Sequence, residues 1–278
     1  MINTRLKITN LLVNSFITNN RLTHFLAKIY LKYLPVYLTG RFYYMPSDRF
    51  QILPQILSGQ LDNYVFSVMR KYINPGSNIV DIGANIGTYS IFFSDLTGSR
   101  GRVFAFEPDS MNLQYLKRNI KLNRVKNITA IRKAVSDRNG KAKLYLSEAL
   151  TWDHRLFNPP GEKRKYEIVS QVKLDSLLVA KKIDFIKMDV QGYEDKCLEG
   201  MQQIINKNKN LLIFTEFWPK GLKDAGTDPL GLINKIKSLG FKIYTVDALK
   251  EKIEPLRNIN LILSLKNYDY VDLLCIKK

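Results

Sequence analysis

The chain has 278 residues, 45% of them hydrophobic and 11% aromatic, so it can bury a full core as one large domain or two small ones. Its two cysteines, Cys197 and Cys275, exclude a disulfide framework and lack metal-ligand spacing, which predicts a reducing, cytoplasmic setting. The 43 Lys and Arg residues against 25 Asp and Glu give a net charge of +18, which suits nucleic acid, anionic lipid or an acidic substrate, and which a solvated basic surface also explains.

The first 60 residues are predicted to form a helical arm and a connecting segment. Apolar residues follow helical spacing over residues 22–34 and Pro35 ends that helix, while residues 6–17 are predicted to be helical too. Residues 1–50 carry seven Lys or Arg and one acid, so one interpretation is a basic helix lying on an anionic membrane. We favour a helix packed on the main domain or against a second copy of the chain. No apolar run reaches the ~20 residues of a membrane span.

The stretch N-I-V-D-I-G-A-N-I-G-T-Y-S, residues 78–90, organises the rest of the chain. A short helix, residues 64–72, precedes it. A β-branched apolar run then ends at Asp81, small residues follow, and a run with helical period begins at Ile86. This pattern predicts a buried parallel strand, a glycine turn and a helix N-terminus, where a ligand can approach bare backbone and free N–H groups.

Two more strands continue the alternation. Residues 102–107 form a strand that ends in Glu107, Asp109 can cap the helix that follows, and residues 127–132 form a third strand. This order predicts right-handed βαβ units and a doubly wound parallel sheet, which binds ligands at the carboxyl ends of its strands. The residues expected to converge there on a cofactor are Asp81, Gly83, Ala84, Asn85, Gly87, Glu107, Ser136 and Asp137.

Glu107 and the residues that replace two glycines of the dinucleotide motif indicate which ligand binds this turn. Glu107 lies 20 residues beyond Gly87, where an acid accepts both hydroxyls of a ribose; a surface acid stabilised by the helix dipole is the alternative. A dinucleotide needs G-x-G-x-x-G, but Asn85 and Thr88 replace the second and third glycines. Asp81 is a poor neighbour for a diphosphate and suits an ammonium group, directly or through water. A nucleoside joined to an amino acid meets both demands, and that ligand is S-adenosylmethionine.

Residues 141–146 and 167–172 predict an inserted β-hairpin joined by a polar loop. The loop contains N-P-P-G at residues 158–161, which is similar to the N-P-P-[YF] motif of amino-group methyltransferases. That motif follows the fourth strand and ends in an aromatic residue, whereas this one precedes the strand and ends in Gly161. We therefore interpret it as a turn.

Four further strands are predicted, at residues 183–189, 211–216, 241–246 and 271–276. They complete a seven-stranded sheet in which the last two strands form a hairpin around a long polar loop. The fourth strand ends in Asp189, beside the first strand, and Glu194 follows within the next helical turn. These two acids can serve as a base for a substrate hydroxyl or as metal ligands. Glu194 can instead complement the helix dipole and bond the loop.

The motifs D-I-G-A-N-I-G-T-Y-S, F-E-P-D, V-K-L-D-S-L-L and K-M-D-V-Q-G-Y-E occur in this order, and the chain resembles the FkbM family of methyltransferases over roughly residues 60–250. The resemblance implies a class I methyltransferase fold, with a Rossmann-like seven-stranded sheet and an antiparallel last strand, at residues 61–278 after the arm at 1–60. It implies S-adenosylmethionine as the cofactor and an acceptor hydroxyl on a sugar, glycan or secondary metabolite. Gln191 stands where many members have Glu, so we assign no metal. The implied cofactor residues are Asp81, Gly83, Asn85, Gly87 and Glu107, and Asp189 has an active-site position.

For O-methyl transfer by in-line displacement, most of the rate comes from orientation, and a base takes the hydroxyl proton. Asp189 is the first candidate for this base, with His154 and Glu194 behind it. His154 lies in the loop of the inserted hairpin, where a lone histidine is more often solvated.

Two other functions use the positive charge. A nucleic-acid methyltransferase is disfavoured because residues 117–143, with ten Lys or Arg and one acid, are expected largely at the amino-terminal edge of the sheet, away from the reacting face, and lack aromatic interleaving. A non-catalytic protein would use the arm and the basic face to bind a membrane or a glycan-assembly complex. This binding role does not exclude catalysis, because a lipid-linked glycan acceptor would suit both a membrane-binding protein and a methyltransferase.

Overall fold

The computed structural model describes residues 63–277, together with 33–38, 40–46 and the single residues Phe25, Lys28, Ile29, Leu31 and Asp48. The helix predicted at residues 6–17 lies outside the described residues. Within the described part of the chain, no helix is long and apolar enough to cross a membrane.

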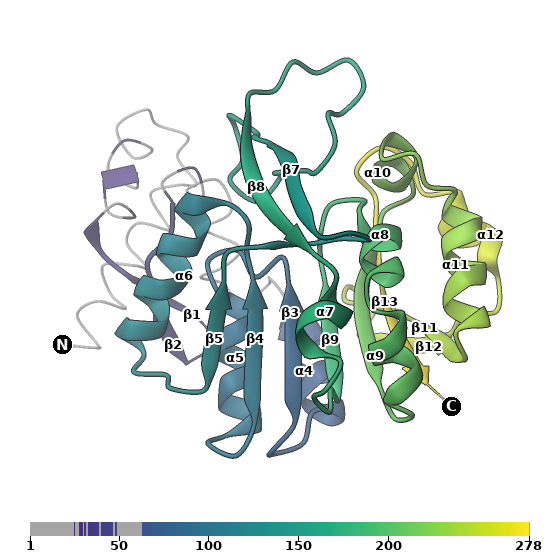
Figure 1. The fold of residues 1–278 in the computed structure, drawn as a ribbon, viewed down its shortest axis with the longest axis horizontal. Coiled ribbons are helices and arrows are strands. Elements are labelled where there is room, and N and C mark those ends of the chain that lie inside the picture. Colours follow the sequence, from purple (N-terminus) through teal and green to yellow (C-terminus); the bar gives the residue numbers. More distant parts are fainter. Residues whose placement is uncertain are drawn as a thin grey trace.

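The central sheet consists of β3 (Asn78–Ile82), β4 (Arg102–Phe106), β5 (Ile128–Ile131), β9 (Phe185–Met188), β10 (Leu212–Phe217), β11 (Phe241–Asp247), β12 (Lys252–Pro255) and β13 (Val271–Lys277). Its order is β12-β11-β13-β10-β9-β3-β4-β5 (Figure 1). Strands β5, β4, β3, β9 and β10 pair in parallel, and β13 lies antiparallel between β10 and β11. The doubly wound sheet with an antiparallel last strand is confirmed. The prediction of a long polar loop before β13 was wrong in one respect, because that segment contains the edge strand β12.

Neighbouring residues of the central strands face opposite layers of helices, which explains why these strands are apolar without interruption. The helices are α4 (Asn63–Tyr72), α5 (Thr88–Thr97), α6 (Ser110–Leu122), α7 (Leu174–Leu178), α8 (Glu194–Glu199), α9 (Gln202–Lys207), α10 (Pro219–Asp224), α11 (Pro229–Ser238) and α12 (Ile259–Leu263). Ile79 belongs to an apolar cluster with residues of α4 and α5, whereas Val80 belongs to one with residues of α8 and α9.

The predicted insertion is a small sheet above the carboxyl ends of the central strands (Figure 1). In it, β8 (Tyr166–Val172) pairs antiparallel with β7 (Gly140–Tyr145) and parallel with the short strand β6 (Ala134–Val135). The inserted hairpin is confirmed. The loop between β7 and β8 therefore lies on the side of the sheet where a ligand binds.

The described part of the arm packs on the main domain, as the favoured alternative predicts. A hairpin of β1 (Val36–Leu38) and β2 (Arg41–Tyr43) follows residues of a helix, and Leu31 and Tyr43 are buried in a cluster with Ile86 and Ile91. The side chain of Asn119 on α6 both donates to and accepts from the backbone of Tyr44. A membrane or dimer contact of the arm stays a prediction.

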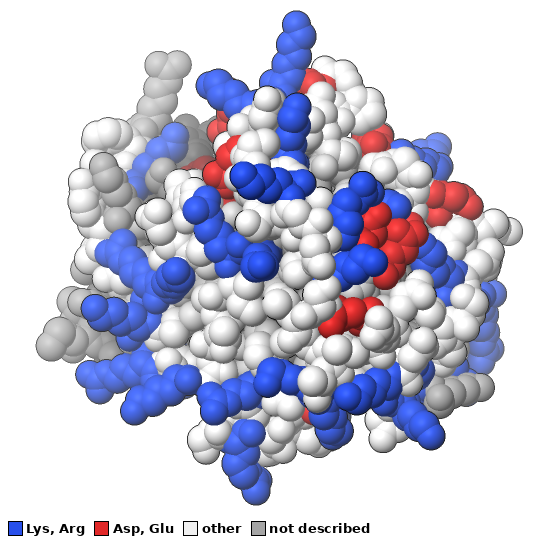
Figure 2. Space-filling view, in the orientation of Figure 1, with Lys and Arg blue, Asp and Glu red and all other residues white. Residues whose placement is uncertain are grey.

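The basic stretch at residues 117–143 was expected to lie largely at the amino-terminal edge of the sheet. That prediction was wrong for the second half of the stretch. The chain crosses the sheet in β5, so Lys121 and Lys126 lie near the amino edge while Lys141 and Lys143 lie on β7 at the carboxyl side. Figure 2 shows a row of basic side chains along the lower edge of one face, where the parallel strands begin.

Candidate active site

The turn between β3 and α5 brings bare backbone to the carboxyl end of the sheet. Gly83 and Gly87 have φ angles of 77° and 91°, and Asn85 between them has a φ of 51°. This left-handed conformation suits glycine and is tolerated by asparagine. A Cβ atom on Gly83 would lie 2.0 Å from the backbone oxygen of Asp189, and one on Gly87 would lie 2.4 Å from Leu116. The small residues are required because the turn crosses the end of β9 and the side of α6.

We expect Gly83→Ala to lose several kcal/mol of unfolding free energy, because it combines a strained φ with a clash against backbone. Gly240→Ala is the matched control, since Gly240 has a φ of 87° but nothing within 4 Å of an added Cβ. It should lose roughly 1–2 kcal/mol. Urea denaturation measures both losses, and equal losses would contradict the close approach at Gly83.

Glu107 directly follows β4, and its buried carboxylate lies beside this turn. Oε2 accepts a hydrogen bond from the backbone N–H of Asn85 at 2.7 Å, and Oε1 accepts one from Asp109 at 2.9 Å. Burial raises the pKa of Glu107 to about 8, although the two N–H groups act in the opposite direction. Each carboxylate oxygen retains a second lone pair, so the geometry fits the predicted contact with two ribose hydroxyls.

A cavity of about 540 Å³ opens over the carboxyl ends of β3, β4, β9 and β10. The predicted site residues that line it are Gly83, Ala84, Asn85, Glu107, His154 and Asp189. The predicted site residues whose atoms do not line it are Asp81, Gly87, Ser136, Asp137 and Glu194. The backbone turn, the carboxylate of Glu107 and this cavity together fit a nucleoside joined to an amino acid.

Asp81 is fully buried and faces protein, not the cavity. Its Oδ2 accepts a hydrogen bond from the Ser90 hydroxyl at 2.6 Å, and Lys187 Nζ lies 3.9 Å from Oδ1. Burial raises the pKa of Asp81, while Lys187 and Ser90 lower it. Because Lys187 lines the cavity beside this carboxylate, the predicted direct contact between Asp81 and the cofactor's ammonium does not fit, and the contact through water stays a prediction.

Asp189 lies in the cavity between two polar neighbours. Its Oδ1 accepts a hydrogen bond from Gln191 Nε2 at 2.8 Å, and Lys187 Nζ lies 3.4 Å from Oδ2. The Asp189 side chain is 38% exposed. Among the described residues, no group of three or more His, Cys, Asp or Glu side chains is arranged to hold a metal ion. The carboxylate of Asp189 is therefore oriented and accessible from the cavity.

Glu194 is buried beneath the loop that follows β9. Its Oε1 accepts weak hydrogen bonds from the backbone N–H groups of Val190, at 3.3 Å, and Gly192, at 3.4 Å. Burial raises the pKa of Glu194 to about 7. This arrangement matches the alternative role, a contact with the loop, and places Glu194 where it supports the backbone around Asp189.

Ser136 and Asp137 lie outside the cavity, and the expectation that they reach a cofactor does not fit the structure. The chain leaves the central sheet in β6 to pair with β8, which takes both residues toward α8. Asp137 pairs with Arg138 and Lys196, and the guanidinium of Arg138 holds the pKa of Asp137 at about 2. The cavity is lined instead by residues 133–135, just before this point.

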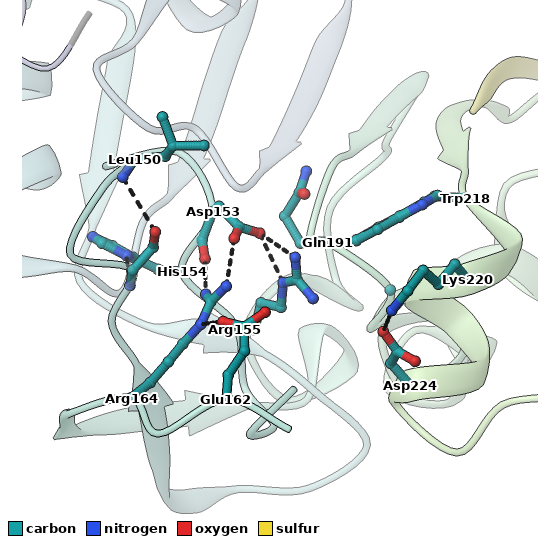
Figure 3. Close-up of polar contacts among 12 residues, drawn as sticks. Leu150, Asp153, His154, Arg155, Glu162, Arg164, Gln191, Trp218, Lys220 and Asp224 are labelled. Atoms are coloured by element: carbon teal, nitrogen blue, oxygen red, sulfur yellow. Dashed lines mark hydrogen bonds and ion pairs between the residues drawn. The ribbon is translucent and has the colours of Figure 1, made fainter. Parts of the chain in front are cut away.

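The loop of the insertion, residues 147–165, is held by two arginines that share one acid (Figure 3). Arg155 Nε donates to Asp153 Oδ1 at 2.7 Å, and Arg164 Nη2 donates to Asp153 Oδ2 at 2.6 Å. The guanidinium of Arg155 also lies 4.7 Å from the ring centroid of Trp218. The loop is thereby tied to the segment after β10, and both Arg155 and Trp218 line the cavity.

One ring nitrogen of His154 accepts a hydrogen bond from the loop. Nδ1 accepts a hydrogen bond from the backbone N–H of Ser147 at 3.1 Å, and Nε2 lies 3.9 Å from Asp109 Oδ2. Burial lowers the pKa of His154, although Asp109 raises it, so Nδ1 is unprotonated at neutral pH. Because the lone pair of Nδ1 accepts the N–H of Ser147 within the same loop, this geometry favours a role of His154 in fixing the loop over a role as a base.

We expect the loop at residues 147–165 to loosen as the pH falls from 7 to 5. The folded pKa of His154 lies below its ordinary value of 6.5, so opened states bind more protons and gain population below that pH. Hydrogen exchange, corrected for its intrinsic pH dependence, should show faster loop exchange at pH 5. In His154→Asn, whose amide oxygen can replace Nδ1, this acceleration should disappear; its persistence would contradict the assignment.

Sequence reasoning missed Lys187, Glu216, Arg155 and Trp218 as cavity residues. For Lys187 a signal was present, since side chains alternate along a strand and Lys187 precedes Asp189 by two positions. Glu216 is the next-to-last residue of β10 and lies beside Asp189, so the same rule of carboxyl ends applies to it. No local pattern placed Arg155.

The family model described as "Methyltransferase FkbM domain" matches residues 81–243, more than half of the chain. This chain belongs to the FkbM methyltransferase family. Its cofactor is S-adenosylmethionine, and the matched region contains the turn, Glu107 and Asp189. No curated protein sequence matches this FkbM methyltransferase.

Several solved structures resemble the FkbM methyltransferase at low sequence identity. A Streptococcus mutans protein described as a methyltransferase, in complex with S-adenosylhomocysteine, has 11% identity and a TM-score of 0.47 over 77% of this chain and 96% of that one. A Clostridium thermocellum protein described as an rRNA methylase has 13% identity and a TM-score of 0.46 over 80% of this chain and 97% of that one. A Thermotoga maritima S-adenosylmethionine-dependent O-methyltransferase has 14% identity and a TM-score of 0.43 over 87% of this chain and 77% of that one.

Proposed function

We propose that this FkbM methyltransferase methylates a hydroxyl group of a sugar, glycan or secondary metabolite. The observation that carries the proposal is the carboxylate of Asp189, which is open to the cavity and oriented by Gln191 and Lys187. S-adenosylmethionine supplies the methyl group, and Glu107 with the backbone of residues 83–85 would hold it. Asp189 orients the acceptor hydroxyl and takes its proton.

The acceptor half of the cavity favours a polyhydroxylated molecule. Glu216 follows Thr215, which pairs with Met188 on β9, so it lies beside Asp189 near the end of β10. Asp272 is the strand partner of Glu216. All three acids line the cavity, as do the aromatic side chains Trp218 and Tyr268. Carboxyl groups accept hydrogen bonds from hydroxyl groups, and the exposed ring of Tyr268 can contact an apolar sugar face.

Transfer of tritium from methyl-labelled S-adenosylmethionine tests the proposal. Purified protein is incubated with neutral and amino sugars, oligosaccharides, polysaccharides, small hydroxylated metabolites and RNA. We expect label in a hydroxyl acceptor as a methyl ether, which survives mild alkali, and loss of that label in Asp189→Asn. Label in RNA alone, or only in alkali-labile methyl esters, would refute the proposed acceptor class.

A further inference from the structure

We infer that Lys187 receives the carboxylate of the cofactor's methionine end. The inference rests on the proposed function in one respect, namely that the methyl group faces an acceptor beside Asp189. Lys187 belongs to β9, and its side chain is only 6% exposed although it lines the cavity.

The direction of the cofactor across the sheet follows from two residues. Glu107, after β4, fits the ribose, and Asp189, after β9, lies on the other side of β3. The sulfonium must lie toward Asp189 for its methyl group to reach an acceptor there. The methionine end therefore extends toward β9, and the adenine extends toward β5, where residues 133–135 line the cavity.

The ammonium of Lys187 is fixed at this methionine end. Lys187 is the strand partner of Asp81, and its Nζ lies 3.9 Å from Asp81 Oδ1 and 3.4 Å from Asp189 Oδ2. The same Nζ lies 4.5 Å from the centroid of the Tyr89 ring. A lysine held on several sides loses little side-chain entropy when a ligand binds, so its contact with an anion is effective.

Charge selects the carboxylate as the partner of Lys187. Of the described Lys and Arg residues, those lining the cavity are Lys133, Arg155 and Lys187. Lys133 follows β5 on the adenine side, and Arg155 donates to Asp153 in the loop. Lys187 is thus the cation nearest to the methionine end. Burial raises the pKa of Asp81, which moderates the negative charge beneath Lys187.

Isothermal calorimetry with two ligands tests this inference without an acceptor. One ligand is S-adenosylhomocysteine, and the other is its decarboxylated analogue, which keeps the adenosine, the thioether and the amine. Wild type should bind S-adenosylhomocysteine about 10 to 100 times more tightly, the range expected for one charge-assisted hydrogen bond. Lys187→Met should bind the two ligands within about threefold of each other, and Lys187→Arg should keep part of the preference.

Two further variants separate this role from a structural one. Lys133→Met removes a cation from the same cavity and should keep the wild-type preference. Asp81→Asn combined with Lys187→Met removes both charges of the buried pair, so it should fold even if Lys187→Met does not, and it should still lack the preference.

Each outcome decides between the inference and its alternatives. Equal weakening of both ligands by Lys187→Met, or a wild type without preference, overturns the inference and leaves the proposed function standing. If the double variant retains the preference, Lys187 does not contact the carboxylate. If wild type binds neither ligand, the proposed function fails first.

Discussion

Replacing Glu107 with alanine is expected to weaken the binding of S-adenosylhomocysteine about 100-fold or more. The substitution removes the two oxygens placed to accept ribose hydroxyls, and a hydrogen bond to a charged group contributes about 1.5–3 kcal/mol. It also frees the N–H groups of Asn85 and Asp109, which loosens the turn. Calorimetry measures the affinity, and a thermal unfolding scan shows how much of the loss reflects folding.

Asp137→Asn is the informative control for this substitution. Asp137 was predicted to reach the cofactor, but it pairs with Arg138 and Lys196 outside the cavity. Its replacement should leave the affinity within about twofold of wild type. A large loss in Asp137→Asn, with none in Glu107→Ala, would mean that the nucleoside binds at another part of the sheet edge.

The pH dependence of binding gives a second measure of Glu107. Because burial raises its pKa to about 8, much of the unliganded protein carries a neutral Glu107 at pH 7. The ionised form is the better acceptor for two hydroxyls, so binding at pH 7 should release a proton, and affinity should rise with pH until about 8 to 9. Calorimetry in buffers of different ionisation heat detects the proton, and Glu107→Gln should abolish its release.

The same pKa values fix the direction of the stability change in the unliganded protein. The folded pKa of Glu107, about 8, and that of Glu194, about 7, lie above their ordinary value of 4.5. The unfolded chain therefore loses these protons first, and the free energy of unfolding should fall as the pH rises from about 4.5 to 8. At saturating cofactor, the part of this pH dependence that comes from Glu107 should become smaller.

The sheet could be predicted because its rules are local and periodic. Each strand is a short apolar run, and the glycine turn and the acid at residue 107 occur at spacings that one ligand explains. The carboxyl-end rule also brought Glu107 and Asp189 to the same cavity. The sequence pattern therefore predicts reliably at which end of a strand a residue lies.

The errors arise where the partner of a side chain comes from another strand or from an irregular segment. Asp81 has the expected position, but the strand order places Lys187 beside it and changes what a ligand meets. Ser136 moves away because β6 pairs with the insertion and not with β5. Arg155 depends on a loop whose shape is set by Asp153 and Trp218, and no spacing rule describes such contacts.

Asp189→Asn is expected to lower kcat for the methylated hydroxyl about 100- to 10,000-fold, the usual contribution of a positioned base. Asparagine has nearly the same shape, so the cavity and the KM for the acceptor should change little. Its amide can no longer take a proton, and its NH₂ group would face either the amide of Gln191 or the ammonium of Lys187. The rate is measured with the acceptor found by label transfer, at saturating S-adenosylmethionine.

Glu194→Gln and His154→Asn distinguish Asp189 from the other predicted bases. Glu194 lies beneath the loop and outside the cavity, and the Nδ1 atom of His154 already accepts the N–H of Ser147. We therefore expect each of these variants to keep kcat within about tenfold of wild type and to act mainly on stability or on the loop. A loss confined to His154→Asn would make the histidine the base. A loss confined to Asp189→Asn would leave the carboxylate at the end of β9 as the group that accepts the proton, which is what its open position between Lys187 and Gln191 predicts.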